Sequence, residues 1–242
     1  MATQVTGGGG SSALFAFQLG GTPVRVHTSF FILSAVLGLS GNRDAAELAV
    51  WMVVVTFSVL IHEMGHALAG RACGLLPVID LHGMGGTTSW VRSPLLRWWQ
   101  NAGISVAGPL VGFAVAGLLL AQRVLYDEGP VPLPGQPTTG ANTLMQLLVS
   151  DLLFVNIVWG IFNLLPILPL DGGSALASLL KGLTKGGGQR AAHVISILTA
   201  GVLLLLALWT RQIWIGFLAG LFAWQNIQAL RALGGATSFP RT

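Results

Sequence analysis

The residues with the clearest chemical potential read His-Glu-Met-Gly-His, at positions 62–66, within an otherwise apolar stretch. His62 and His66 are four residues apart, so on a helix they share one face and can bind one metal ion. Glu63 lies beside the first histidine, where the general base for a metal-activated water belongs. Because the chain has only five His residues, the pattern arises by chance in about one such chain in a thousand. These polar residues are costly on a hydrocarbon-facing helix, so they indicate function rather than structure.

A catalytic zinc takes three protein ligands and leaves one position open for water. The best candidate for the third ligand is Asp171, at the end of the apolar run NLLPILPLDGG, residues 163–173. Two prolines interrupt this run just before Asp171, and two glycines after it allow a tight turn. A broken helix inside a membrane is tolerated where it lines a wet cavity. The alternative is that the run simply ends and Asp171 begins the next helix as an N-cap.

Five further polar residues have less specific explanations. Cys73 is the only cysteine, which excludes an intramolecular disulfide, and we interpret it as a small packed residue rather than a metal ligand. His82 lies in a glycine-rich segment, and a gate or surface position is favoured over metal binding. His193 and Asp151 are expected at the membrane interface. Asn156 is expected to hydrogen-bond between helices.

The composition indicates a membrane protein whose helices must position these residues. Hydrophobic residues make up 53% of the chain and charged residues only 8%, whereas a soluble domain carries about 25% charge. The basic residues are scattered singly, so we expect no nucleic-acid partner. The chain shows six apolar segments, near residues 28–40, 46–70, 101–121, 146–168, 193–210 and 212–230. The predicted fold class is therefore an all-α polytopic membrane protein with about six transmembrane helices.

The remaining segments define the expected domain organisation. Residues 1–20 are Gly/Ser-rich and are expected to be disordered, without the basic start of a secretory signal. Residues 21–231 are expected to form one six-helix membrane core, and residues 232–242 a short C-terminal tail. The Gly- and Thr-rich segment 74–100 predicts a small β-hairpin or re-entrant loop at the membrane edge. The segment 122–145 contains four prolines and is predicted to be a loop.

The distribution of Lys and Arg predicts the orientation. In the six-helix model the side that holds both termini and the loops 71–100 and 181–190 carries nine of the twelve basic residues. The opposite side carries only Arg43, Arg123 and Arg211. The positive-inside rule makes the first side cytoplasmic. Since Arg71 follows His66 by five residues, or about 7.5 Å of helix, the metal site is expected near the cytoplasmic face.

Several motifs together carry a family resemblance. They are HEMGH at 62–66, Asn163-x-x-Pro166, Leu170-Asp171-Gly172-Gly173, SVAGPLVGF at 105–113 and VRVHTSFF at 24–31. The set resembles the site-2 protease family of intramembrane zinc metalloproteases. The last motif, VRVHTSFF, is similar to the opening segment of the minimal branch of this family, whose members process sporulation sigma factors. The resemblance covers roughly residues 20–230, and the chain departs from better-known members in showing no peptide-binding domain and no nucleotide-binding tail.

The resemblance implies a site and an activity. It implies one zinc per chain, held by His62, His66 and Asp171, with Glu63 as catalytic base. It further implies that Asn163 binds or polarises the substrate backbone. The expected reaction is hydrolysis of a peptide bond in or near a transmembrane segment of a membrane-embedded protein, as in the regulated release of a transcription factor or anti-sigma factor. The expected location is a bacterial plasma membrane, with both termini in the cytoplasm.

Substrate binding is expected at the predicted hairpin. Its glycines Gly83, Gly85 and Gly86 lie in the segment 81–90, which offers an edge strand for an extended peptide. Asn163 is the second expected contact to the substrate.

Two alternatives use the same motif. A zinc carrier or sensor would bind metal without proteolysis, although a transporter is expected to carry polar residues through several spans. A membrane protease of the prenyl-protein type would take its third ligand from a later glutamate. Glu128, the only glutamate after residue 66, lies in the Pro-rich loop and fits that role poorly.

Overall fold

The computed structural model describes residues 13–39, 43–92, 94–126, 143–184 and 188–235. The helices in the described ranges are α1 (Thr28–Leu39), α2 (Ala45–Ala72), α3 (Trp98–Leu125), α4 (Thr143–Phe154), the π-helical turn η1 (Val155–Trp159), α5 (Gly160–Asn163), α6 (Asp171–Leu183), α7 (Gly188–Trp209) and α8 (Ile213–Gly235). The strands are β1 (Phe15–Leu19), β2 (Thr22–Val26), β3 (Leu76–His82) and β4 (Gly85–Arg92).

Five helical segments in these ranges are long and apolar enough to cross a membrane. They are Ala45–Ala72, Trp98–Leu125, Leu144–Asn163, Gly188–Trp209 and Ile213–Leu233. They correspond to five of the six predicted segments. The first predicted segment forms α1, which has 12 residues and is about 18 Å long, whereas a span needs about 20 residues. It does not extend toward the N-terminus as a helix, because residues 22–26 form strand β2.

The fold is mostly helical, as predicted, but a sheet of four strands stands where a two-stranded hairpin or re-entrant loop was predicted. Strands β3 and β4 pair antiparallel across a turn that contains Gly83. Strand β2 pairs parallel with β3 and antiparallel with β1, which gives the order β1-β2-β3-β4. Strand β1 lies inside the range 1–20, which was predicted to be disordered. The regular structure therefore begins several residues before the predicted end of that range. The parallel β2–β3 pairing joins residues more than fifty positions apart, which no local pattern reveals.

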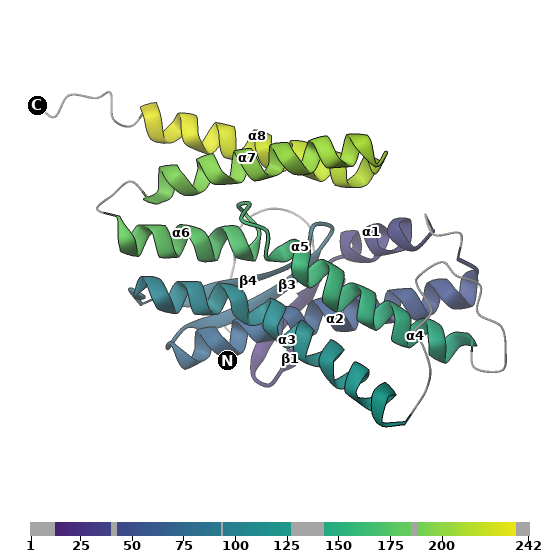
Figure 1. Ribbon diagram of the computed structural model, residues 1–242. Helices are drawn as coiled ribbons and strands as arrows, with labels where there is room; N and C mark the ends of the chain where they lie inside the picture. The colour runs from purple at the N-terminus through teal and green to yellow at the C-terminus, as the bar shows by residue number, and fades with distance from the viewer. Residues whose placement is uncertain (1–12, 40–42, 93, 127–142, 185–187, 236–242) are drawn as a thin grey trace, which may run out of the picture.

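The segment that follows α3 forms a helix that breaks and resumes. The helical stretch 143–163 ends at Asn163, irregular backbone covers 164–170, and α6 begins at Asp171. Figure 1 shows α5 and α6 meeting near the middle of the molecule and running toward opposite ends. The sequence predicted the break, and the alternative given for Asp171, that it begins the next helix, matches α6, whose 13 residues start there.

The last two helices form a hairpin that lies on α6. Helices α7 and α8 pack along each other, α7 also packs on α6, and α6 packs on α3. Figure 1 shows this stacking order, with α7 and α8 on the side of α6 that faces away from α3. The hairpin therefore reaches the rest of the molecule mainly through α6 and the irregular segment before it.

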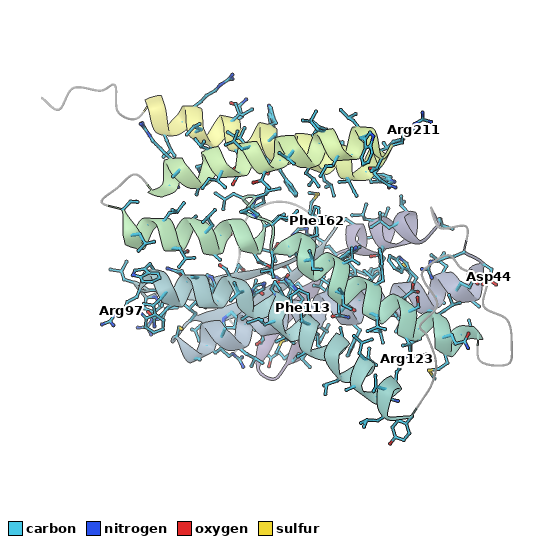
Figure 2. All side chains as sticks on the ribbon, viewed as in Figure 1. Asp44, Arg97, Phe113, Arg123, Phe162 and Arg211 are labelled. Carbon is cyan, nitrogen blue, oxygen red and sulfur yellow. The ribbon has the colours of Figure 1, made fainter. Side chains whose placement is uncertain are left out.

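The described residues next to several helix ends alternate between the two ends of the molecule. Figure 2 shows Arg97 at one end and Asp44, Arg123 and Arg211 at the other. This alternation agrees with the grouping of basic residues used for the orientation. Parts of the predicted loops, residues 127–142 and 185–187, lie outside the described residues, as do residues 1–12 of the N-terminus and 236–242 of the tail.

Two polar residues that were expected at the membrane interface are buried. Asp151 on α4 is 0% exposed and accepts two hydrogen bonds from Arg43, at 2.8 and 2.7 Å. His193 on α7 is also buried, and its Nδ1 lies 2.8 Å from Oδ1 of Asn226 on α8. Each of these polar side chains is satisfied by a partner from a distant segment, which the sequence did not indicate, and the interfacial location stays a prediction. The expected interhelical bond of Asn156 is confirmed, since its Nδ2 donates to Ser58 Oγ on α2 at 3.0 Å.

Candidate metal centre

Helix α2 carries the metal-binding motif. A capping box between Asp44 and Glu47 starts this helix, and its 28 residues run unbroken past the motif. His62 and His66 therefore lie one turn apart on one face, with their Nε2 atoms 3.2 Å from each other. Both Nε2 atoms point to one place, as the four-residue spacing predicted.

Asp171 comes to the same place from a different part of the chain. Its Oδ2 lies 3.0 Å from His62 Nε2, and its Oδ1 lies 3.3 Å from His66 Nε2. Asp171 is also the first residue of α6, and Leu170 is the N-cap residue. The two explanations weighed from the sequence are thus compatible, because the residue that begins the next helix also faces the two histidines.

The three side chains fit a zinc ion. Nitrogen and oxygen ligands about 2.0–2.1 Å from a tetrahedral zinc lie about 3.3–3.4 Å from one another. The three distances among His62, His66 and Asp171 are 3.2, 3.0 and 3.3 Å. The donor set of two imidazoles and one carboxylate is also typical of catalytic zinc, with a fourth position left for water.

Helix α3 supports the two histidines from the other side. The Ile104 carbonyl oxygen lies 2.7 Å from His66 Nδ1, so this nitrogen carries the proton and donates it to the carbonyl. The bond fixes the tautomer in which Nε2 is free to bind a metal. Gly108 lies over the same histidines, and a Cβ there would come within 2.4 Å of His66 Nε2. Any larger residue at position 108 would occupy the metal site.

Strand β4 holds the carboxylate of Glu63. Thr88 Oγ1 lies 2.7 Å from Glu63 Oε2 and 3.1 Å from the Glu63 carbonyl oxygen, so its hydroxyl can donate to either. Gly86 on the same strand also lies against Glu63, because a Cβ there would meet the glutamate side chain at 2.4 Å. The sheet therefore positions the expected base, a role that nothing in the sequence assigned to Thr88.

Two carboxylates compete for the third ligand position. Glu63 and the two histidines have ligand atoms within 4.8 Å of one another, so they also form a group that can hold a metal ion. Asp171 lies closer to both histidines, and Glu63 is already bonded to Thr88. The distances therefore favour Asp171 as a ligand and leave Glu63 beside the site.

The remaining candidate residues lie on the hairpin, on α5 and at the end of α2. Gly86 lies at the site, whereas Gly83 lies in the turn of the hairpin and Gly85 begins β4. The Gly83 N–H donates to Ser29 Oγ on α1. Asn163 is half-buried at the end of α5, eight residues before Asp171. His82 lies in the hairpin 2.9 Å from Thr87 Oγ1, and Cys73 is the residue that ends α2.

Comparisons with known proteins point to one class. The family model described as peptidase family M50 matches residues 126–208, a range that includes Asn163 and Asp171. A candidate zinc metalloprotease of Synechocystis is 29% identical over 192 residues, covering 74% of this chain and 46% of that protein. A zinc metalloprotease of Methanocaldococcus jannaschii is 30% identical over 166 residues, covering 68% of this chain and 44% of its own length. The chain thus spans less than half the length of these two relatives.

A solved structure resembles the whole described fold. The site-2 protease from Methanocaldococcus jannaschii aligns with a TM-score of 0.58 and 26% identity, covering 89% of this chain and 95% of the solved chain. Fold and site together resemble the zinc metalloproteases named above: the chain is mostly helical, has apolar helices long enough to span a membrane, and brings His62, His66 and Asp171 together at distances that fit a metal ion. More particularly, the chain carries a site-2 protease domain of peptidase family M50, and the resemblance predicted from its motifs is confirmed.

Proposed function

We propose that this protein is an intramembrane zinc metalloendopeptidase that cleaves a membrane-embedded protein in or near a transmembrane segment. The observation that carries the proposal is the convergence of His62 and His66 on α2 with Asp171 on α6, at distances that suit one zinc ion per chain. Glu63 lies beside this group without being needed as a ligand. A site that only stored or sensed zinc would have no use for a spare, oriented carboxylate.

Each residue of the site has its own role in the proposed reaction. A zinc ion held by His62, His66 and Asp171 would supply an activated water and would polarise the scissile carbonyl. Glu63 accepts the proton from that water on its carboxylate and later passes it to the leaving amine. Thr88 orients this carboxylate through the 2.7 Å hydrogen bond. Asn163 on α5 donates from its side-chain amide to the substrate backbone and stabilises the charge that develops there.

Strand β4 is proposed to receive the substrate. It lies at the edge of the sheet, pairs only with β3 in the described part of the chain, and contacts Glu63 through Gly86 and Thr88. An extended peptide that adds to this edge would bring its backbone beside the proposed base. The glycines Gly83 and Gly85 shape the turn that ends this platform.

The biological setting follows from the same proposal. The substrate is a membrane protein whose cleavage releases a soluble regulator, such as a transcription factor or an anti-sigma factor. The location is a bacterial plasma membrane, with the termini and the active-site side toward the cytoplasm. The basic residues support this orientation, because nine of twelve fall on the side of the loops 71–100 and 181–190.

The decisive experiment pairs two variants of the purified protein in detergent. Asp171→Ala should lose most of its zinc and all cleavage of a model transmembrane substrate. Glu63→Gln should keep one zinc per chain and lose nearly all activity, because the ligands remain and the base is gone. Zinc content by mass spectrometry and cleavage by gel separate the two effects. Cleavage by Glu63→Gln near the parent's rate would contradict the proposed base, and zinc binding without any cleavage by the parent would favour a carrier or sensor.

A further inference from the structure

Three buried polar side chains of the α7–α8 hairpin have no role in the proposed chemistry. His193 and Ser196 on α7 and Asn226 on α8 are 9%, 1% and 2% exposed. Polar groups are costly inside apolar helices unless they find hydrogen-bond partners. All three are joined, directly or through one another, to the backbone of Leu168 in the irregular segment between α5 and α6.

Both backbone polar groups of Leu168 form hydrogen bonds to side chains of the α7–α8 hairpin. Its N–H donates to Ser196 Oγ at 2.9 Å, and its carbonyl oxygen accepts from Asn226 Nδ2 at 2.6 Å. His193 Nδ1 donates to Asn226 Oδ1 at 2.8 Å, which fixes the amide so that its nitrogen faces Leu168. We call His193, Ser196 and Asn226 the Leu168 clamp.

The segment needs such partners because it cannot satisfy its own backbone. It is irregular over 164–170, and Pro166 and Pro169 lack the N–H that a helix would use. Irregular backbone at membrane depth is stable only where protein groups take the place of water. An apolar contact reinforces the clamp, since Ile167 packs between Ala200 of α7 and Phe222 of α8.

Local contacts join the residues on either side of Leu168 to the first turn of α6, which begins with the proposed third ligand. The Leu170 N–H donates to the Ile167 carbonyl at 2.8 Å, and the Ser174 N–H donates to the Leu170 carbonyl at 2.9 Å. The first turn of α6 is pressed against the same segment: a Cβ at Gly172 would meet the Leu164 carbonyl oxygen at 2.0 Å. A displacement of Leu168 is therefore passed to Asp171, three residues later.

We propose that the Leu168 clamp is a positioning site that holds Asp171 opposite His62 and His66 and so raises the affinity of the protein for zinc. The inference rests on the zinc site of the proposed function. The two histidines are held by α2 and α3, whereas Asp171 is held by α6, which packs on both α3 and α7, and by a segment seated on α7 and α8. The clamp therefore fixes the position of Asp171 relative to His62 and His66.

The test measures zinc affinity of the full chain in detergent by competition with a chelator. Asn226→Asp keeps the side-chain shape but removes the donor to the Leu168 carbonyl, and Ser196→Ala removes the acceptor for its N–H. Each should weaken zinc binding about 10–100-fold, the usual effect of losing a group that orients a metal ligand. Activity of both variants should return as zinc is raised, because the defect lies in metal binding.

Ser178→Ala is the matched control. The Ser178 hydroxyl on α6 donates to the Ser174 carbonyl at 2.9 Å, just as the Ser196 hydroxyl donates to the Ala192 carbonyl at 2.8 Å, but among the described residues it forms no hydrogen bond to the segment 164–170. Its zinc affinity should equal the parent's. Parent-like affinity in Ser196→Ala, or an equal loss in Ser178→Ala, would overturn the proposal. If Asn226→Asp fails to fold, Ser196→Ala alone decides.

The same titration separates this inference from the function on which it rests. Asp171→Ala is measured beside the parent. If the parent binds no zinc, the proposed function itself fails. If the parent binds zinc, Asp171→Ala does not, and both clamp variants bind as the parent does, the zinc site stands and only the role of the clamp is lost.

Discussion

At the scale of single residues, the site depends on groups that orient other groups. His66 is fixed by the Ile104 carbonyl, Glu63 by Thr88, and Asp171 by its place at the start of α6. A base and its metal ligands act only when held within a few tenths of an ångström of the productive geometry. The residues that touch the proposed metal are therefore only part of what the activity needs.

Thr88 offers a direct test of this dependence. Thr88→Val keeps the shape and the strand preference of the side chain but removes the hydroxyl that bonds to Glu63. We expect kcat to fall about 10–100-fold, since hydrogen bonds to charged groups contribute about 1.5–3 kcal/mol. Zinc content should not change, because the ligands are untouched.

Thr88→Ser is the control for this prediction. It retains a hydroxyl at the same position and should recover most of the parent kcat. A Thr88→Val enzyme with the parent's kcat would show that Glu63 needs no help from the sheet.

At the scale of elements, the sequence predicted the long helices better than the short elements and the long-range pairings. The motif 62–66 was placed correctly on a long helix because apolar length and His spacing are local signals. Helix α6 was only an alternative because Pro and Gly surround its start, and the parallel β2–β3 pairing was missed because it joins distant segments. The clamp residues were missed for the same reason: their partner, Leu168, is an apolar residue whose backbone alone takes part.

The ion pair between Arg43 and Asp151 joins two elements, the start of α2 and α4. It is bidentate and buried, and the Arg43 guanidinium also lies 4.8 Å from the Trp51 ring centre. Asp151→Ala leaves a buried charge without a partner and should lower the free energy of unfolding by about 3–5 kcal/mol. Unfolding in mixed micelles by addition of sodium dodecyl sulfate measures the loss.

Removing both charges is the informative comparison. Arg43→Met combined with Asp151→Leu replaces the pair by apolar groups and should cost much less than Asp151→Ala alone. An equal loss in the single and double variants would mean that packing, rather than the unpaired charge, sets the stability of this contact.

At the scale of the whole molecule, the alternating loops predict which residues face each side of the membrane. Tyr126 and Thr184 are exposed and end α3 and α6, which run to opposite ends of the molecule. With Cys73 replaced by alanine, we expect an impermeant thiol reagent added to whole cells to modify Tyr126→Cys but not Thr184→Cys. Both positions should react after the cells are opened. The reverse pattern in intact cells would overturn the orientation.

The architecture also limits which substrates can be cut. The proposed base lies against the edge strand β4, and a peptide bound there must be extended over several residues. A transmembrane helix reaches that state only by breaking backbone hydrogen bonds, which is costly in lipid. Gly or Pro near the scissile bond lowers this cost because such residues weaken the helix before it binds.

We therefore expect helix stability of the substrate to control the rate. A substrate with Gly and Pro near the cleavage point should be cut faster than the same substrate with that segment replaced by leucines, and the difference should be larger in liposomes than in detergent. Initial rates of both substrates in both media measure this, with Glu63→Gln as the blank. If the leucine-rich helix is cut as fast as the Gly/Pro version in liposomes, unwinding does not limit the reaction. The edge of β4 would then have to receive a segment that is already extended outside the membrane.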